Sequence, residues 1–500
     1  MSSNTNNNTN QAPAGASAAA VAEAVTEHIL SRKNSGTQIN TLPYVPTGQN
    51  DETQARMMQA MFSPTSVVAA KPTTATTTAA AAASHRQWHR FDQSQIKVLL
   101  LESVSPVAIQ TLEAAGYQVE SVKGALSEAE LVERIQDVHV LGIRSKTKVT
   151  ATVLAAARRL LVIGCFCIGT NQVDLAAASK RGVAVFNSPY ANSRSVAEMT
   201  LANIINLSRQ LGDRNNEMHK GEWNKVSKGC YEVRGKTLGI IGYGHIGSQL
   251  SVLAEALGIR VVYHDVIQIM PLGSARQLRS LDEVLGCADF VTLHVPETPD
   301  TKLMMGVKEL AKMKKGSYLI NASRGTVVDI DALAGALRAG HLAGCAVDVY
   351  PWEPATNGPL FESPLVGCPN TLLSPHIGGS TEEAQRAIGL EVSRALVSWV
   401  AEGVSFGSVN LPGLALKPLV PNPMTIRVTN IHRNVPGVLR KINLLLAEFN
   451  IERQSSDSNG EVAYLVADVT LDQGKLEDQL RTVHEGISKL EENIMVRVFY

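Results

Sequence analysis

The amino-acid sequence predicts an α/β protein with two parallel-sheet domains and a smaller C-terminal α/β unit. Strand and helix patterns alternate from Ile96 to Phe186 and again from Thr237 to Ser374. The chain beyond Pro423 instead follows the order β-α-β-β-α-β. Parallel strands need crossover connections, which are usually helices, so each alternating series favours a parallel sheet.

The first series starts with a compact apolar run over 97–101, which is typical of a buried parallel strand. A helix over 107–115 is expected to end at Gly116, and a helix over 127–135 to begin with a capping box made by Ser127 and Glu130. The remaining strands of this series are expected at 117–122, 138–143, 160–163 and 183–186.

The second series follows a long predicted helix over 193–210 and precedes a helix over 381–401. Its strands are expected at 238–241, 260–263, 290–294, 318–321, 343–347 and 371–374. Four prolines between 412 and 423 then indicate a linker.

The tail unit has the order of a ferredoxin-like fold. Its strands are expected at 425–429, 451–456, 462–469 and 494–500, and its helices at 438–449 and 476–490. Apolar residues recur at helical spacing on both helices and are expected to face the sheet. They are Leu439, Ile442, Leu446 and Phe449 on the first helix and Leu476, Leu480, Val483, Ile487 and Leu490 on the second.

Composition excludes several classes of protein. The 500 residues carry 46 basic and 46 acidic side chains, so the basic field of a nucleic-acid-binding protein is absent. No apolar stretch approaches the roughly 20 residues of a membrane helix. The six cysteines have no repeating spacing, and Cys165 and Cys167 suit buried packing better than a metal site. We expect a soluble, cytoplasmic protein without a bound metal.

Residues 1–92 differ from the rest of the chain, because they are rich in Asn, Ala, Ser and Thr and poor in aromatic residues. Such a segment buries too little apolar surface to offset its conformational entropy, so we expect a disordered extension. A mitochondrial presequence is the alternative. The first 31 residues contain Glu23 and Glu27 but no Lys or Arg, which disfavours it.

A glycine pattern indicates a dinucleotide site. Gly242, Gly244 and Gly247 form G-x-G-x-x-G between an expected strand and an expected helix, and His245 and Ile246 lie inside it. Asp265 closes the next strand, where a carboxylate accepts hydrogen bonds from ribose hydroxyls and repels a 2′-phosphate. The sequence therefore favours NAD over NADP.

Three polar segments follow expected strand ends, where open α/β sheets bind ligands. They contain Arg324, Glu353 and His376. A guanidinium binds a carboxylate, and an imidazole accepts the hydroxyl proton as hydride leaves the neighbouring carbon. A carboxylate beside the imidazole stabilises its protonated form. This set suits oxidation of a hydroxy acid, and we expect its members to meet in one cleft.

The region 96–411 resembles the D-isomer-specific 2-hydroxyacid dehydrogenases. The segments that carry the likeness are GCFCIGTNQVD, LGIIGYGHIG, LINASRGTVVD and SPHIGGST, which begin at Gly164, Leu238, Leu319 and Ser374. The resemblance extends to the branch that has one C-terminal ACT domain and oxidises 3-phospho-D-glycerate to 3-phosphohydroxypyruvate. It implies two Rossmann- or flavodoxin-like domains around a cleft, with the helix after 379 returning to the first domain.

The resemblance also implies a role for particular residues. The catalytic residues are Arg324, Glu353 and His376. The NAD contacts, beyond the glycine loop and Asp265, are Ala322, Ser323, Arg324, Asp348, His376, Ile377, Gly378 and Gly379. The substrate contacts are Arg144, Ser145, Lys146 and Asn192. From the residues alone, the basic turn at 144–146 fits a phosphate site and a solvated surface turn equally well.

For the tail, the likeness implies an ACT domain that binds L-serine through His432, Asn434 and Asn450. A dimerisation module without a ligand is the alternative. The implied domains are 93–191 with 379–415 for substrate, 192–378 for NAD and 423–500 for regulation, in a homo-oligomeric dimer or tetramer. Dehydrogenation of another D-2-hydroxy acid and a non-catalytic NADH-sensing scaffold remain alternative functions.

Overall fold

The computed structural model describes residues 92–354, 357–359, 361–419, 424–472 and 474–499. The predictions made for 1–91, both the disordered extension and the alternative presequence, lie outside the described residues.

The first sheet has five parallel strands in the order β2-β1-β3-β4-β5. The strands are β1 (Lys97–Leu100), β2 (Gln118–Ser121), β3 (Val140–Ile143), β4 (Val162–Cys165) and β5 (Ala184–Phe186). The helices are α3 (Pro106–Ala114), α4 (Glu128–Arg134), α5 (Ala151–Ala156) and α6 (Leu175–Lys180), after the short 3-10 turn Gln93–Gln95. This is the flavodoxin-like strand order, and its switch point lies between β1 and β3.

The second sheet has seven parallel strands in the order β12-β11-β10-β9-β6-β7-β8. They are β6 (Thr237–Ile241), β7 (Arg260–His264), β8 (Arg276–Gln277), β9 (Phe290–Leu293), β10 (Tyr318–Asn321), β11 (Gly344–Val347) and β12 (Thr371–Leu373). The helices are α7 (Ser193–Ser208), α8 (Leu211–His219), α9 (His245–Ala256), α10 (Leu281–Cys287), α11 (Val307–Lys312) and α12 (Ile330–Arg338), with a 3-10 turn at Gly325–Val327. This is the Rossmann order, with its switch point between β6 and β9.

The structure tests two local predictions, the capping box at Ser127 and the long helix that begins at residue 193. The capping box is confirmed, because the Ser127 hydroxyl accepts from the Glu130 N–H and the Glu130 carboxylate accepts from the Ser127 N–H. The long helix expected over 193–210 is also confirmed, as α7 over Ser193–Ser208, two residues shorter than expected. Gln210 has a left-handed backbone (φ 52°) that ends α7, and α8 starts at the next residue.

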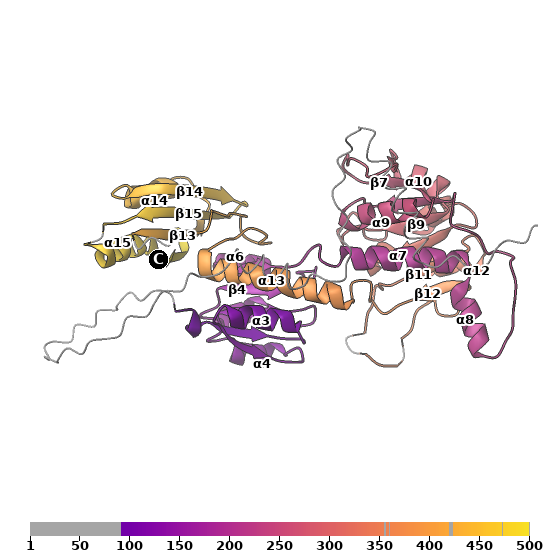
Figure 1. The fold of residues 1–500 in the computed structure, drawn as a ribbon, viewed down its shortest axis with the longest axis horizontal. Coiled ribbons are helices and arrows are strands. Elements are labelled where there is room, and N and C mark those ends of the chain that lie inside the picture. Colours follow the sequence, from indigo (N-terminus) through magenta and orange to yellow (C-terminus); the bar gives the residue numbers. More distant parts are fainter. Residues whose placement is uncertain (1–91, 355–356, 360, 420–423, 473, 500) are drawn as a thin grey trace, which may run out of the picture. The chain divides into compact units, whose positions relative to one another are not determined.

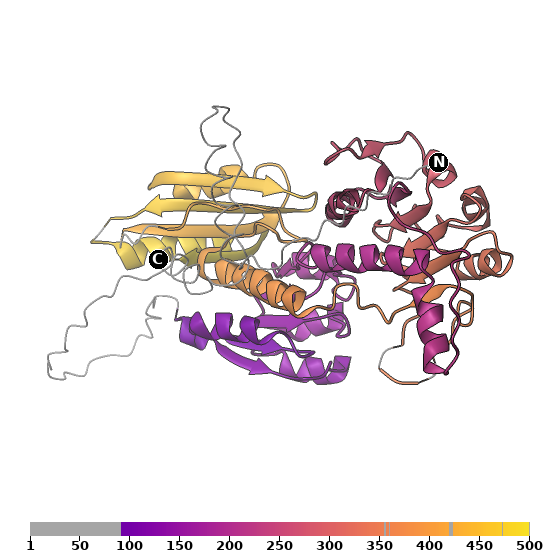
Figure 2. The same cartoon turned by 45° about the vertical axis from the view of Figure 1, so that its right-hand side comes forward.

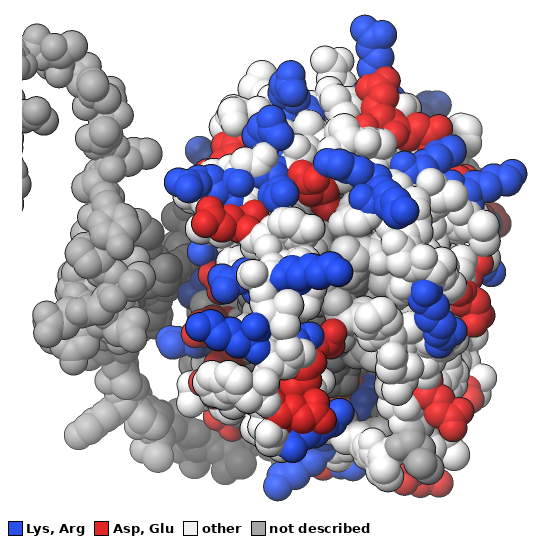
Figure 3. Space-filling model, turned by 90° about the vertical axis from the view of Figure 1, so that its right-hand side faces the viewer, with Lys and Arg blue, Asp and Glu red and all other residues white. Residues whose placement is uncertain are grey.

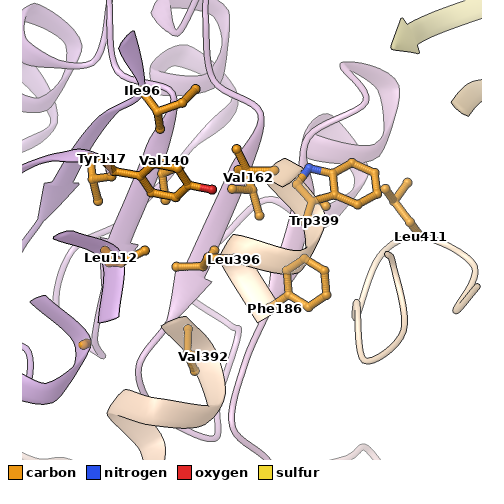
Figure 4. Packing of buried hydrophobic residues seen from close by; sticks show 14 of the residues in the cluster. Ile96, Leu112, Tyr117, Val140, Val162, Phe186, Val392, Leu396, Trp399 and Leu411 are labelled. Atoms are coloured by element: carbon orange, nitrogen blue, oxygen red, sulfur yellow. The ribbon is translucent and has the colours of Figure 1, made fainter. Parts of the chain in front are cut away.

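Helix α13 (Glu382–Glu402) belongs to the core of the first sheet, although it follows the second sheet in sequence. It lies along α3 (Figures 1 and 2), and its Val392 and Leu396 point at Val140 and Val162 of the strands (Figure 4). Gly164 leaves the space for this packing, since a Cβ there would lie 2.8 Å from Val392. The helix therefore connects the segment that carries His376 to the first sheet.

The tail is a four-stranded antiparallel sheet in the order β14-β15-β13-β16, which is the ferredoxin-like arrangement. Its elements are β13 (Thr425–Arg433), α14 (Val438–Leu446), β14 (Asn450–Ser458), β15 (Val462–Thr470), α15 (Leu476–Ser488) and β16 (Asn493–Phe499). One predicted core position is wrong, because Leu439 is 40% exposed and Val438 takes its place in the core with Ile442 and Leu446. The spacing of apolar residues predicted the buried face of this helix, but at its first turn the residue that faces the sheet is Val438 and not Leu439.

The tail sheet contacts the end of α13. The Arg497 guanidinium donates to the carbonyls of Trp399 and Val400, and the Tyr464 hydroxyl donates to that of Gly403. The last carbonyls of a helix have no partner within the helix, so side chains of the tail satisfy them. The described residues of the predicted linker, 412–419, form no helix or strand, and Leu414 among them is buried in the core that contains Trp399.

None of the helices within the described ranges is long and apolar enough to cross a membrane. On the face shown in Figure 3, basic and acidic side chains are interspersed with uncharged ones.

Candidate active site

Two neighbouring pockets, of about 450 and 300 Å³, lie at the carboxyl ends of the strands of both parallel sheets. Five residues line both pockets: Ile168, Asn192, Arg324, His376 and Gly379. The larger pocket adds Arg144 and Glu353, and the smaller one adds the glycine loop. The predicted catalytic residues thus lie together in one pocket. The same pocket contains Arg144, a predicted substrate contact that precedes His376 by 232 residues in the chain (376 − 144).

His376 and Glu353 form the central pair of the larger pocket. The His376 Nδ1 lies 2.9 Å from Glu353 Oε2 and 3.1 Å from Oε1. The hydrogen bond to Glu353 raises the pKa of His376, although burial opposes it. Burial would raise the pKa of Glu353, but the hydrogen bonds from His376 and from the Tyr350 N–H hold it below its usual value. Because Nδ1 donates to the carboxylate, Nε2 is left to accept a proton.

Asp348 braces the turn that carries His376. This buried carboxylate accepts from the Ser374 hydroxyl at 2.5 Å and from the Ile377 and Gly378 N–H groups at 2.9 and 2.8 Å. His376 itself has a left-handed backbone (φ 53°), a conformation with a cost on the order of 1–3 kcal/mol unless surrounding contacts fix it. The resemblance implied that Asp348 touches NAD; it lines the smaller pocket, but its polar contacts position the histidine.

Arg324 follows β10 in a tight turn. The Asn321 side chain accepts from the Ser323 N–H and donates to the Arg324 carbonyl, and the Arg324 guanidinium donates to the Ser323 carbonyl. The next residue must be small, because a Cβ on Gly325 would lie 1.9 Å from the Tyr350 carbonyl carbon. This close approach brings the arginine turn against the segment that carries Glu353.

The glycine loop has the geometry of a pyrophosphate cradle. Gly242 has φ 88°, and a Cβ there would lie 2.4 Å from the His294 carbonyl oxygen, while a Cβ on Gly247 would lie 2.4 Å from the Gly242 oxygen. Gly244 has open space, and it caps α9 directly before His245 and Ile246, which line the smaller pocket. A helix N-terminus with an open approach favours a phosphate anion.

Asp265 lies beside this loop, where its Oδ2 accepts from the Tyr243 N–H at 2.8 Å. Its other oxygen takes a longer bond from the Ile267 N–H, so lone pairs remain for ribose hydroxyls. Together with the cradle, these residues fit NAD. Ala322, Ser323, Gly378 and Gly379 line the smaller pocket as expected, whereas the Ile377 side chain does not and is 47% exposed.

Sequence reasoning missed two residues of the smaller pocket. His294 directly follows β9, and burial lowers its pKa to about 4, so it is neutral; its Nδ1 is buried without a hydrogen-bond partner. Tyr190 stacks on His245 with ring centroids 3.7 Å apart. His294 could have been predicted in the same way as Arg324, because both follow a strand of the second sheet. The sequence contains no pattern that predicts the contact of Tyr190 with the glycine loop.

The predicted substrate residues divide into two groups. Arg144 lines the larger pocket, and Asn192 lines both pockets with a buried Oδ1 that has no hydrogen-bond partner. Ser145 and Lys146 are exposed and line neither pocket. Among the described residues, no group of His, Cys, Asp and Glu side chains is arranged to hold a metal ion.

A third pocket, of about 600 Å³, lies in the tail and is lined by His432 and Asn434. His432 is in β13 rather than in a loop; burial lowers its pKa, against the Asn430 backbone and Glu492, and its Nδ1 has no hydrogen-bond partner. The Asn434 amide donates to the Gly460 carbonyl. Asn450 does not line this pocket, because it pairs with Thr470 at the opposite end of β15.

Comparison with known proteins identifies the family of the chain. Residues 201–378 match the family model for the D-isomer specific 2-hydroxyacid dehydrogenase, NAD binding domain. The chain is 56% identical over 420 residues to D-3-phosphoglycerate dehydrogenase 1 of Saccharomyces cerevisiae, an alignment that covers 82% of this chain and 89% of the relative. The corresponding protein of Dictyostelium discoideum is 55% identical over 410 residues, with coverage of 82% and 98%.

The chain belongs to the D-3-phosphoglycerate dehydrogenases. Its fold also matches the crystal structure of a D-isomer specific 2-hydroxyacid dehydrogenase from Lactobacillus delbrueckii in an NAD-complexed form, with a TM-score of 0.56 and 27% identity. That match covers 63% of this chain and all of the other. As a D-3-phosphoglycerate dehydrogenase, the chain is an NAD-dependent oxidoreductase, and the matched NAD binding domain contains the glycine cradle.

Proposed function

We propose that the chain oxidises 3-phospho-D-glycerate at C2 to 3-phosphohydroxypyruvate, the first step of L-serine biosynthesis. The observation that carries the proposal is the His376–Glu353 pair, which lies in one pocket with the guanidinium groups of Arg324 and Arg144. A substrate with a carboxylate at one end and a phosphate at the other matches two guanidinium groups that come from different sheets.

Each residue has a defined chemical part. The His376 Nε2 accepts the C2 hydroxyl proton, and Glu353 stabilises the imidazolium that forms. Arg324 binds the substrate carboxylate and polarises the C2 oxygen, while Asp348 keeps the histidine turn in place. The glycine loop and Asp265 would hold NAD, which would supply the hydride acceptor for C2. Closure around the pocket excludes water and strengthens these charge contacts.

The test is an assay of NADH formation with the purified full chain and 3-phosphoglycerate. The Arg144→Ala variant is expected to raise the KM for phosphorylated substrates and to leave glyoxylate reduction nearly unchanged. If another D-2-hydroxy acid is turned over with higher kcat/KM than 3-phosphoglycerate, the substrate assignment is wrong. If Arg144→Ala raised the KM for glyoxylate as much as the KM for phosphorylated substrates, Arg144 would not recognise the phosphate.

For the tail, we propose an ACT domain that binds L-serine as an inhibitor. The buried, unpartnered Nδ1 of His432 and the neighbouring Asn434 support an amino-acid site in the tail pocket. Asn450 pairs with Thr470, whereas His432 pairs with Ala463, seven residues earlier on β15. At the usual strand rise this separation is roughly 23 Å, so Asn450 of one chain does not reach the pocket that His432 and Asn434 line. The assay run with and without L-serine tests this, with His432→Ala expected to remove any inhibition.

We also propose that the chain forms a homo-oligomer and acts in the cytoplasm. Exposed apolar side chains on and after α8 support the first point, since Trp223 is 81% and Met218 54% exposed. Analytical ultracentrifugation of the full chain would show a dimer or tetramer, and Trp223→Ala should weaken it. Fluorescence microscopy of the tagged chain tests the location.

A further inference from the structure

The carboxyl ends of β1 and β3 meet at the switch point of the first sheet, where open α/β sheets bind ligands. Arg144 directly follows β3 and begins the basic turn, defined here as residues 144–147. Glu102 follows β1 and lies opposite that turn. This residue belongs to no pattern noted in the sequence, yet it is a carboxylate with only 8% of its surface exposed.

The Glu102 carboxylate binds the backbone of the basic turn. Its Oε1 accepts from the N–H groups of Arg144 at 3.2 Å and Thr147 at 2.8 Å, and its Oε2 accepts from Lys146 at 2.9 Å. A carboxylate has enough lone pairs for all three donors, whereas an amide would present its own N–H₂ to one side of them. The geometry therefore requires the acid rather than its amide.

The backbone at Glu102 is itself held in place. Glu102 and Ser103 both have left-handed backbones, with φ values of 65° and 53°, which are unfavourable for residues other than glycine. Hydrogen bonds from the Glu102 N–H to the Gly124 carbonyl and from the Ser103 hydroxyl to the Lys123 carbonyl fix this conformation. Strain of this kind, maintained by neighbouring contacts, clusters at functional sites.

The opposite side of the basic turn is fixed by Gln172. Its Nε2 donates to the Arg144 carbonyl at 2.6 Å and to the Gly169 carbonyl at 3.2 Å. Glu102 thus accepts from the backbone N–H of Arg144, and Gln172 donates to its backbone carbonyl. The guanidinium of Arg144 remains available to the larger pocket, which it lines.

We propose that Glu102 is a positioning residue that sets the preference for phosphorylated substrates by fixing the basic turn. The inference rests on the proposed function, because it assumes that Arg144 meets the substrate phosphate. With the backbone of the turn fixed in advance, less conformational entropy is lost there when the phosphate binds. Glu102 touches neither the His376 pair nor the glycine loop through any hydrogen bond of the described residues.

The test uses Glu102→Gln in the full chain, assayed by NADH oxidation with 3-phosphohydroxypyruvate and with hydroxypyruvate. We expect the KM for the phosphorylated substrate to rise about ten-fold, the size of one lost charge-assisted hydrogen bond, with kcat and the KM for hydroxypyruvate within about two-fold. Glu113→Gln, an exposed carboxylate on α3, is the matched control and should change neither KM.

A double-mutant cycle separates positioning from general loss of structure. If Glu102 acts through Arg144, adding Glu102→Gln to Arg144→Ala should raise the KM for 3-phosphohydroxypyruvate less than about two-fold further. Should Glu102→Gln fail to fold, Gln172→Met removes the other anchor, and the same selective rise is expected. An equal rise for both substrates, an unchanged preference or multiplicative effects in the cycle would overturn the inference.

The wild-type chain distinguishes the two possible failures. If it shows no preference for 3-phosphohydroxypyruvate over hydroxypyruvate, the proposed substrate is wrong. If it shows that preference and Glu102→Gln retains it, the proposed function stands and the role of Glu102 is wrong.

Discussion

The catalytic cleft and the tail each contain a carboxylate paired with a cationic side chain, and the two pairs differ mainly in burial. His376 and Glu353 are 2.9 Å apart, with side chains 52% and 37% exposed. Arg427 and Asp468 in the tail are 2.7 Å apart and 1% and 0% exposed, and Arg453 donates to the same carboxylate at 2.6 Å. The hydrogen-bond lengths are similar, so length alone does not show what a pair does.

Burial determines which pair takes part in chemistry. The cleft pair is open to ligand and contains an imidazole, so it changes its charge within the physiological pH range. In the tail pair, Arg427 also donates to the carbonyls of Glu402 and Lys417. In the proposed reaction the first pair exchanges a proton, whereas the second pair fixes the tail sheet against the end of α13.

Loss of the cleft imidazole should have the largest effect. His376→Ala removes the proton acceptor, so kcat for 3-phosphoglycerate should fall by roughly 100- to 10,000-fold. NADH affinity, measured by fluorescence titration, should be retained because the glycine cradle is intact. A variant with wild-type kcat would contradict the role given to His376.

Loss of the buried carboxylate should come next, and it should act on stability. Asp468→Ala leaves the Arg427 guanidinium buried without its carboxylate partner, and breaking such a pair costs about 3–5 kcal/mol. Urea denaturation followed by circular dichroism would measure the loss. A change below about 1 kcal/mol would mean that the tail tolerates an uncompensated charge, and the contrast between the two pairs would fail.

Glu353→Gln should have an intermediate effect, visible in the pH profile. Glu353 raises the pKa of His376, and oxidation requires the neutral imidazole in the free enzyme. Without the carboxylate the histidine pKa falls, so the acidic limb of log kcat/KM should move to lower pH while the plateau drops because the imidazolium loses its partner. A limb that stays in place would show that another group controls it.

The smallest effect is expected for an exposed ion pair, which also serves as the control for Asp468. Asp282 pairs with Lys312 at 2.8 Å, with side chains 58% and 44% exposed. Asp282→Ala should change the free energy of unfolding by no more than about 1 kcal/mol, and added salt should reduce the difference. A loss as large as that of Asp468→Ala would show that burial is not the deciding variable.

The sequence by itself determined the elements and the chemistry at their ends. Strand–helix alternation, the glycine loop before α9 and the capping box at Ser127 depend on neighbours within a few residues, so a linear pattern records them. Arg324, Glu353 and His376 could be predicted for a similar reason, because each lies shortly after a strand in the sequence and the carboxyl ends of those strands face the cleft.

The tertiary structure alone decided which polar groups support these residues. Asp348 braces His376 from 28 residues away, and Glu102 binds a turn 42 to 45 residues further along the chain. The outward direction of Leu439 and the distance of Asn450 from His432 likewise depend on packing and strand register. A hydrogen bond between distant segments has no period or spacing in the sequence, because the fold, not the chain, makes its two ends neighbours.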